Sequence, residues 1–166
     1  YLSDEEEGTI ALLTKHFRHV IVLVNGGNQI DLNWIKKYSV GTAAFIWQGG
    51  QEGGAGTADM LMGDVPPSGR MIDTAVKHIE LHPAAGHFGD SVENVHTEDI
   101  YVGYRYYETF AKDEVLYPFG YGLSYTTFER ETLSAKKNGD EISLKIRVKN
   151  TGNYAGKDVV QAYFSY

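Results

Sequence analysis

A glycine-rich stretch at residues 49–59 lies between an apolar run at residues 43–47 and a helix-forming run at residues 58–64. This order predicts a buried strand, a tight turn and a helix over about residues 51–62, because glycine permits positive φ and close backbone approach. Turns at the carboxyl ends of parallel strands are common ligand-binding positions. The polar pair Gln51 and Glu52 lies in this turn, so we consider both as candidate binding residues.

The chain before this stretch has the pattern of an α/β domain. Ser3 and Glu6 form a capping-box pattern, which predicts a helix that continues to about Phe17. Residues 20–24 read Val-Ile-Val-Leu-Val, a continuous run typical of a parallel strand that is covered on both faces. A short second helix is expected from Asp31.

The turn at Pro66-Pro67-Ser68-Gly69 separates the third helix from residues 70–72, which favour a short third strand. The resulting order α-β-α-β-α-β is typical of a doubly wound sheet with right-handed crossovers. The fold class is therefore α/β, and we assign residues 1–75 to part of a mostly parallel α/β sandwich domain.

Residues 76–126 show no sustained periodicity and are predicted to form a long loop followed by an aromatic interdomain linker. Within them, residues 100–107 have the composition of a strand. His78 and His82 have the spacing of two zinc ligands on a helix, but no acidic motif accompanies them and Pro83 follows at once. We therefore predict no metal site.

Residues 127–166 have the pattern of an antiparallel β unit. Apolar and polar residues alternate over residues 142–149, as in a strand with one buried face. Asn138-Gly139 predicts a hairpin turn, and residues 159–164 favour a third strand. Because a complete sandwich has about seven strands, this unit is predicted to be a truncated β-sandwich of the fibronectin type III kind.

Composition restricts the partners and the chemistry. The 166 residues carry a formal net charge of −7, which disfavours nucleic acid and anionic membranes as partners. Neither a dinucleotide fingerprint, nor a phosphate-binding loop, nor a nucleophilic serine elbow is present, so no cofactor is expected. The lack of cysteine and of a signal peptide favours a cytoplasmic location, and the amino terminus looks truncated.

Five motifs, in a fixed order along nearly the whole chain, carry a family resemblance. They are residues 22–27 with 30–32, residues 47–54 with 58–59 and 63–70, residues 99–107, residues 117–125, and residues 148–152 with 155–161. Together they resemble glycoside hydrolase family 3, the β-glucosidase and β-xylosidase family. The run His87-Phe88-Gly89-Asp90 is more similar to members in which the domain order is inverted.

The resemblance implies a retaining exo-acting β-glycosidase that removes terminal β-D-glucosyl or xylosyl residues from β-linked oligosaccharides or glycosides. It also implies a nucleophilic aspartate from a TIM-barrel domain of the same protein and an acid/base glutamate from a loop before the first helix. Neither can be placed on this sequence, so we expect no catalytic residue here and no activity of the segment alone.

Gln51, Glu52, Phe88 and Tyr104 are the residues that we expect to line a sugar site, beside the catalytic groups of other segments. A satisfied polar turn and an aromatic domain interface are the purely structural alternatives. A non-catalytic carbohydrate-binding or structural module is the alternative function for the whole chain.

Overall fold

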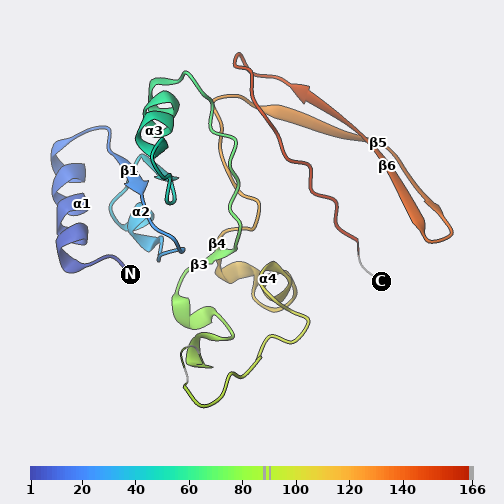
Figure 1. The fold of residues 1–166 in the computed structure, drawn as a ribbon, viewed down its shortest axis with the longest axis horizontal. Coiled ribbons are helices and arrows are strands. Elements are labelled where there is room, and N and C mark those ends of the chain that lie inside the picture. The colour runs from blue at the N-terminus through green and yellow to red at the C-terminus, as the bar shows by residue number, and fades with distance from the viewer. Residues whose placement is uncertain (88, 90, 165–166) are drawn as a thin grey trace. The chain divides into compact units, whose positions relative to one another are not determined.

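The computed structural model describes residues 1–87, 89 and 91–164. The chain divides into two compact units. The first comprises Tyr1–Gly54 and Arg70–Tyr121, and the second comprises Ala55–Gly69 and Gly122–Tyr166. Short helices alternate with two parallel strands in the first unit, whereas a long antiparallel hairpin dominates the second (Figure 1).

Helix α1, Asp4–His16, begins with the predicted capping box. The backbone N–H of Glu6 donates to the Ser3 hydroxyl at 3.3 Å, and the Ser3 N–H donates to a carboxylate oxygen of Glu6 at 2.8 Å. Four consecutive acidic residues in the first turn also suit the positive end of the helix dipole. The start and the length of this helix confirm the sequence-based prediction.

Strands β1, Ile21–Val24, and β2, Thr42–Phe45, form a parallel pair in which Ile21 lies opposite Thr42 and Val24 lies opposite Phe45. Helix α2, Asn33–Lys37, connects them, and helix α3, Gly53–Met62, follows β2. The predicted helices and strands of this region are confirmed. The expected burial of the first strand on both faces is wrong for this chain, because Ile21 is 54% exposed.

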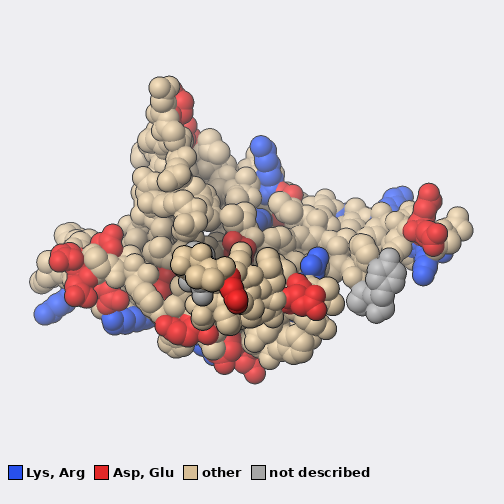
Figure 2. Space-filling model, turned by 60° about the horizontal axis from the view of Figure 1, so that its bottom comes forward, with Lys and Arg blue, Asp and Glu red and all other residues tan. Residues whose placement is uncertain are grey.

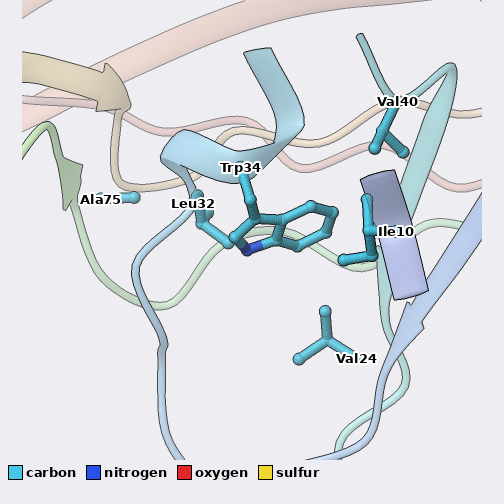
Figure 3. Packing of buried hydrophobic residues seen from close by; sticks show 6 residues of the cluster. All are labelled: Ile10, Val24, Leu32, Trp34, Val40 and Ala75. Carbon is cyan, nitrogen blue, oxygen red and sulfur yellow. The ribbon is translucent and has the colours of Figure 1, made fainter. Parts of the chain in front are cut away.

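The core of the first unit is built around Trp34. Its indole ring lies between Leu32 and Ile10, with Val24 beneath it (Figure 3). Trp34 and Leu32 are each 3% exposed. Burial of side chains of this size contributes about 1.5–3 kcal/mol each, so this cluster is the main source of stability in the unit. Val40 and Ala75 complete it.

The rest of the first unit has less regular structure than its beginning. Its elements are β3 (Ala75–Val76), η1 (Ile79–Leu81), η2 (Ala85–His87), α4 (Tyr104–Phe110), η3 (Lys112–Glu114) and β4 (Val115–Tyr117). Strands β3 and β4 pair antiparallel. Residues 70–72 are not a strand, although Met71 exchanges backbone hydrogen bonds with Gly120 and Tyr121.

The strand expected at residues 100–107 is wrong, because Tyr104 begins helix α4. Gly103 precedes it with φ of 63°, a left-handed conformation that interrupts an extended chain. Tyr107 then buries its ring almost completely, at 2% exposure. Packing of this tyrosine outweighs the β propensity of an aromatic-rich run.

The second unit contains the hairpin of β5, Phe128–Asn138, and β6, Glu141–Asn150. Asn138 pairs with Glu141 across the tip, where Gly139 has φ of 61°, and the predicted hairpin is confirmed. The buried face that the alternation predicted is absent from the described residues, since Ile142 is 52% exposed. Residues 159–164 form no strand. The fibronectin type III-like assignment therefore stays a prediction, whereas the α/β class is confirmed.

Side chains of both charges are interspersed with broad uncharged areas on the face drawn in Figure 2. Many large apolar residues contribute to the exposed surface, including Leu12, Phe17, Leu123 and Phe164. Within the described residues, no helix combines the length and the apolar character that crossing a membrane requires.

Candidate functional site

Two turns meet at the carboxyl edge of the β1–β2 pair. The strands are parallel and in register, so residues 25–28 and residues 46–52 leave the sheet at the same edge. The N–H of Ile46 donates to the carbonyl of Val24 at 2.9 Å, which continues the pairing one step beyond the strands. This edge is the part of an α/β sheet at which ligands usually bind.

The turn after β2 has an unusual backbone. Trp47 adopts φ of 49°, a left-handed conformation that costs a non-glycine residue about 1–2 kcal/mol. Gly50 follows with φ of 62°, and the N–H of Gly53 donates to its carbonyl at 3.2 Å as α3 begins. A Cβ on Gly49 would lie only 2.6 Å from the Cα of Gly53, so this position has no room for a side chain.

Trp47 and Gln48 connect this turn to its surroundings. The indole of Trp47 contacts the ring of Phe45 at a centroid distance of 5.3 Å. The Gln48 amide lies over Gly27, where a Cβ would be 3.3 Å from its nitrogen. The turns after β1 and β2 therefore touch. The sequence analysis did not predict Trp47 and Gln48 as parts of the candidate site. Their position directly before the glycine cluster is the sequence feature that could have indicated them.

The structure places Gln51 and Glu52 in the first unit, directly before α3, with both residues exposed. Their side chains are therefore accessible to a ligand that reaches the carboxyl edge. The Glu52 carboxylate can accept hydrogen bonds from hydroxyl groups, and the Gln51 amide can both donate and accept.

Tyr104 lies on a different element of the first unit, as the first residue of α4. Its ring stacks on Phe119 at a centroid distance of 5.3 Å with an interplanar angle of 22°. The guanidinium of Arg105 lies 5.8 Å from the centroid of the same ring. Phe88, the fourth predicted binding residue, lies outside the described residues.

Of the two histidines considered as zinc ligands, His78 and His82, the second contacts a buried tyrosine. The Tyr107 hydroxyl and the Nδ1 atom of His82 are 2.7 Å apart, and the two rings meet edge to face. Burial raises the pKa of Tyr107 above its usual range, with a smaller contribution from the charge of Glu98. This contact ties the loop around η1 to α4.

No three His, Asp or Glu side chains gather closely enough to hold a metal ion in the part of the chain that the structure describes. The polar groups at the carboxyl edge are suited to hydrogen bonding with a neutral, hydroxyl-rich ligand. A single exposed glutamate at this edge does not supply the two opposed carboxylates that glycoside hydrolysis requires.

Comparison with known proteins identifies the family. The family model described as "Glycosyl hydrolase family 3 C-terminal domain" matches residues 1–125. A β-glucosidase of Ruminococcus albus is 43% identical over 162 residues, which cover 98% of this chain and 17% of that protein. β-Glucosidase A of Butyrivibrio fibrisolvens is 40% identical to this chain, and the match covers 99% of this chain and 22% of that protein.

Solved structures agree with these relatives. A β-glucosidase from Paenibacillus barengoltzii matches with a TM-score of 0.86 and 44% identity, over 91% of this chain and 17% of that one. β-Glucosidase 3B from Thermotoga neapolitana, in complex with glucose, matches with a TM-score of 0.86 and 40% identity. This match covers 94% of this chain and 23% of the Thermotoga chain. This chain thus spans about a fifth of the length of the proteins that it matches. Because the family model covers well over half of its residues, the chain belongs to glycosyl hydrolase family 3.

Proposed function

We propose that this chain is a segment of a retaining, exo-acting β-glucosidase that releases terminal β-D-glucosyl residues from oligosaccharides or glycosides. The observation that carries the proposal is the 43% identity to the Ruminococcus albus β-glucosidase along 98% of this chain. The relatives named above are β-glucosidases, which favours a glucosyl over a xylosyl substrate.

In this proposal, other segments of the longer protein supply the two catalytic acids. The nucleophilic aspartate comes from a TIM-barrel domain, and the acid/base glutamate comes from the segment before α1. The 17% share of the relative's length that this chain covers leaves room for both. We further propose that residues 127–166 are the first strands of a fibronectin type III-like domain, for which the β5–β6 hairpin is the support.

The segment itself contributes a wall of the sugar site. Gln51 and Glu52 are exposed at the carboxyl edge of the β1–β2 pair, where hydroxyl groups of a sugar can reach them. Tyr104, whose ring stacks on Phe119, is an aromatic member of the proposed wall. Phe88, which lies outside the described residues, is proposed as a second aromatic member from the sequence alone. Aromatic faces and charged acceptors together are suited to a pyranose, which has apolar faces and a polar rim.

Replacement of Glu52 by alanine in the full-length enzyme tests this role. We expect KM for an aryl β-glucoside to rise roughly 10- to 150-fold, because one hydrogen bond to a charged group contributes about 1.5–3 kcal/mol. Glu131→Ala, which removes an exposed glutamate from the hairpin, is the control and should leave both kinetic constants unchanged. Unchanged kcat and KM for Glu52→Ala, together with reduced stability, would reject the wall in favour of a structural turn.

A non-catalytic carbohydrate-binding module is the second candidate, which the exposed aromatic residues of the chain favour. Titration of the 166-residue chain with glucose and cellobiose separates the two. Binding without turnover supports a module, whereas the absence of both supports an enzyme segment. Hydrolysis of an aryl β-glucoside by the pure chain would contradict the proposal that both catalytic acids lie elsewhere.

A further inference from the structure

Trp47 has a backbone conformation that its residue type rarely adopts. Three non-glycine residues of the described part of the chain have positive φ, namely Ser39 at 53° and Trp47 and Asp99 at 49°. Aspartate is enriched in this left-handed region, whereas a bulky residue there is an outlier. Glycine adopts it without strain, and the chain has glycine at nearby Gly49 and Gly50. The chain therefore keeps a large aromatic side chain at a strained position of a glycine-rich turn.

Contacts with its neighbours hold Trp47 at the carboxyl edge of the β1–β2 pair. It lies just after β2, and its indole lies against the ring of Phe45 at a centroid distance of 5.3 Å and an interplanar angle of 30°. The next residue, Gln48, places its amide over Gly27 of the neighbouring turn. Strained residues persist where surrounding contacts determine their conformation, and they cluster at ligand-binding positions. The indole is thus fixed within the turn that carries the polar candidate residues.

The indole of Trp47 is suited to the apolar face of a sugar ring. The side chain is only partly buried, and Phe45 lies against one face of its ring. A pyranose has C–H groups on its faces and hydroxyl groups around its rim. It therefore matches an aromatic surface that has the exposed amide of Gln51 and the exposed carboxylate of Glu52 on the same turn.

We propose that Trp47 is a substrate-binding residue whose indole stacks on a pyranose ring of the β-glucoside. This inference rests on the proposed function and adds a stacking surface to the wall formed by Gln51 and Glu52. Stacking fixes the plane of the sugar, while the two polar side chains bind hydroxyl groups on its rim. The strain at Trp47 is then maintained for ligand binding and not for stability.

Substitution of Trp47 in the full-length enzyme tests the stacking. Trp47→Ala should raise KM for both an aryl β-glucoside and cellobiose by roughly 2- to 12-fold, the factor that corresponds to one aromatic contact, with a smaller change in kcat. Trp47→Phe, which keeps an aromatic ring, should recover most of this loss. An unchanged KM for Trp47→Ala would overturn the proposal.

Glycine substitutions separate ligand binding from the backbone conformation. Ser39 shares the left-handed conformation but precedes β2, at the opposite end of the strand from Trp47. Ser39→Gly should leave KM unchanged. Trp47→Gly should raise KM as much as Trp47→Ala and unfold at a higher temperature than that variant, because glycine accepts a positive φ and alanine does not. An equal rise of KM for Ser39→Gly, or a lower unfolding temperature for Trp47→Gly, would contradict the proposal.

Glucose bound by stacking should shield the indole from a collisional quencher. We expect acrylamide to quench the tryptophan fluorescence of the full-length protein less strongly when glucose is present, and most of this difference should disappear in Trp47→Phe. Trp34, the other tryptophan of this chain, is 3% exposed and so is poorly accessible to acrylamide. A glucose effect of full size in Trp47→Phe assigns the shielding to another tryptophan and would overturn the stacking.

The fluorescence measurement requires no turnover, so it separates this inference from the proposed function. Hydrolysis of an aryl β-glucoside with a KM that Trp47→Ala does not change rejects the stacking and leaves the glucosidase proposal standing. Shielding of Trp47 by glucose in a protein without hydrolysis rejects the glucosidase proposal and leaves Trp47 as a sugar-binding residue.

Discussion

The two main strand pairs of this chain differ in what holds them. The β1–β2 pair is short, yet its unit has an apolar core in which Trp34 is 3% exposed. The β5–β6 pair is much longer, yet its apolar side chains remain accessible, with Ile142 at 52% and Leu144 at 44% exposure. The comparison teaches that local sequence can set the register of a hairpin, whereas burial requires other elements to cover it.

Polar contacts take the place of a core around the hairpin. Arg130 on β5 makes a two-pronged ion pair with Asp158, at 2.7 and 2.5 Å, and the Asp158 side chain is 3% exposed. Asn150 joins three backbone and side-chain groups at the end of β6. These contacts hold residues 151–158 against the hairpin.

The largest expected effect comes from removing the centre of the core. Trp34→Ala in the 166-residue chain should lower the free energy of unfolding by about 3–5 kcal/mol, because it removes a buried aromatic ring and leaves a cavity. Leu144→Ala in the hairpin should cost less than about 1 kcal/mol, since its side chain is already half accessible. Urea unfolding followed by circular dichroism measures both. If the two substitutions lower the free energy of unfolding by similar amounts, burial of side chains does not explain the difference between the two strand pairs.

A smaller effect is expected where polar contacts hold the hairpin. The side-chain oxygen of Asn150 accepts from the Thr126 hydroxyl at 2.6 Å and from the Gly152 N–H at 3.0 Å, and its amide donates to the Tyr154 carbonyl at 2.7 Å. Thr126 is 6% exposed, so Asn150→Ala leaves a buried hydroxyl without that acceptor and should cost about 1–3 kcal/mol.

Amide exchange along β5 and β6 measures the effect of Asn150→Ala on local opening. The exposed Asn153 of the same turn provides the control, and Asn153→Ala should change the opening free energy by less than about 0.5 kcal/mol. If both variants leave exchange unchanged, the hairpin is held by its backbone pairing alone.

Sequence reasoning succeeded where a short motif determines local structure. The capping box at Ser3 and Glu6 and the turn at Asn138-Gly139 act within a few residues, and both occur as predicted. It failed where packing decides. Residues 104–107 of the run at residues 100–107 begin helix α4, in which Tyr107 is buried. Residues 159–164 lack a partner strand among the described residues.

The candidate site shows the same division. The glycine cluster predicted a turn before α3, and the structure places Gln51 and Glu52 there. The left-handed backbone of Trp47 and the contact of Gln48 with Gly27 were not predictable, because tryptophan rarely adopts that conformation and the contact joins two separate turns. Whether Gln51, Glu52, Phe88 and Tyr104 bind a sugar stays a prediction.

The smallest effect should come from a polar contact that supplements the core of the first unit. One carboxylate oxygen of Glu7 accepts from the Lys37 ammonium and from the Tyr38 hydroxyl, both at 2.6 Å, and thereby joins α1 to α2. The hydrogen bond from Lys37, followed by that from Tyr38, lowers the pKa of Glu7 below its ordinary value of 4.5. A carboxyl whose pKa falls on folding stabilises the protein above its unfolded pKa, and this contribution is lost as the pH falls through the lower folded value.

Glu7→Gln should therefore lower the thermal unfolding midpoint at pH 7, and the difference from the unchanged chain should shrink as the pH falls below about 4.5. The same substitution in a Lys37→Met background is the control, where the difference at pH 7 should be smaller because the main partner is gone. A difference that does not depend on pH would mean that Glu7 acts through packing. In that case apolar contacts would stabilise the first unit even at its surface. The first unit would then differ from the hairpin, which polar contacts hold, more than the hydrogen bonds of Glu7 suggest.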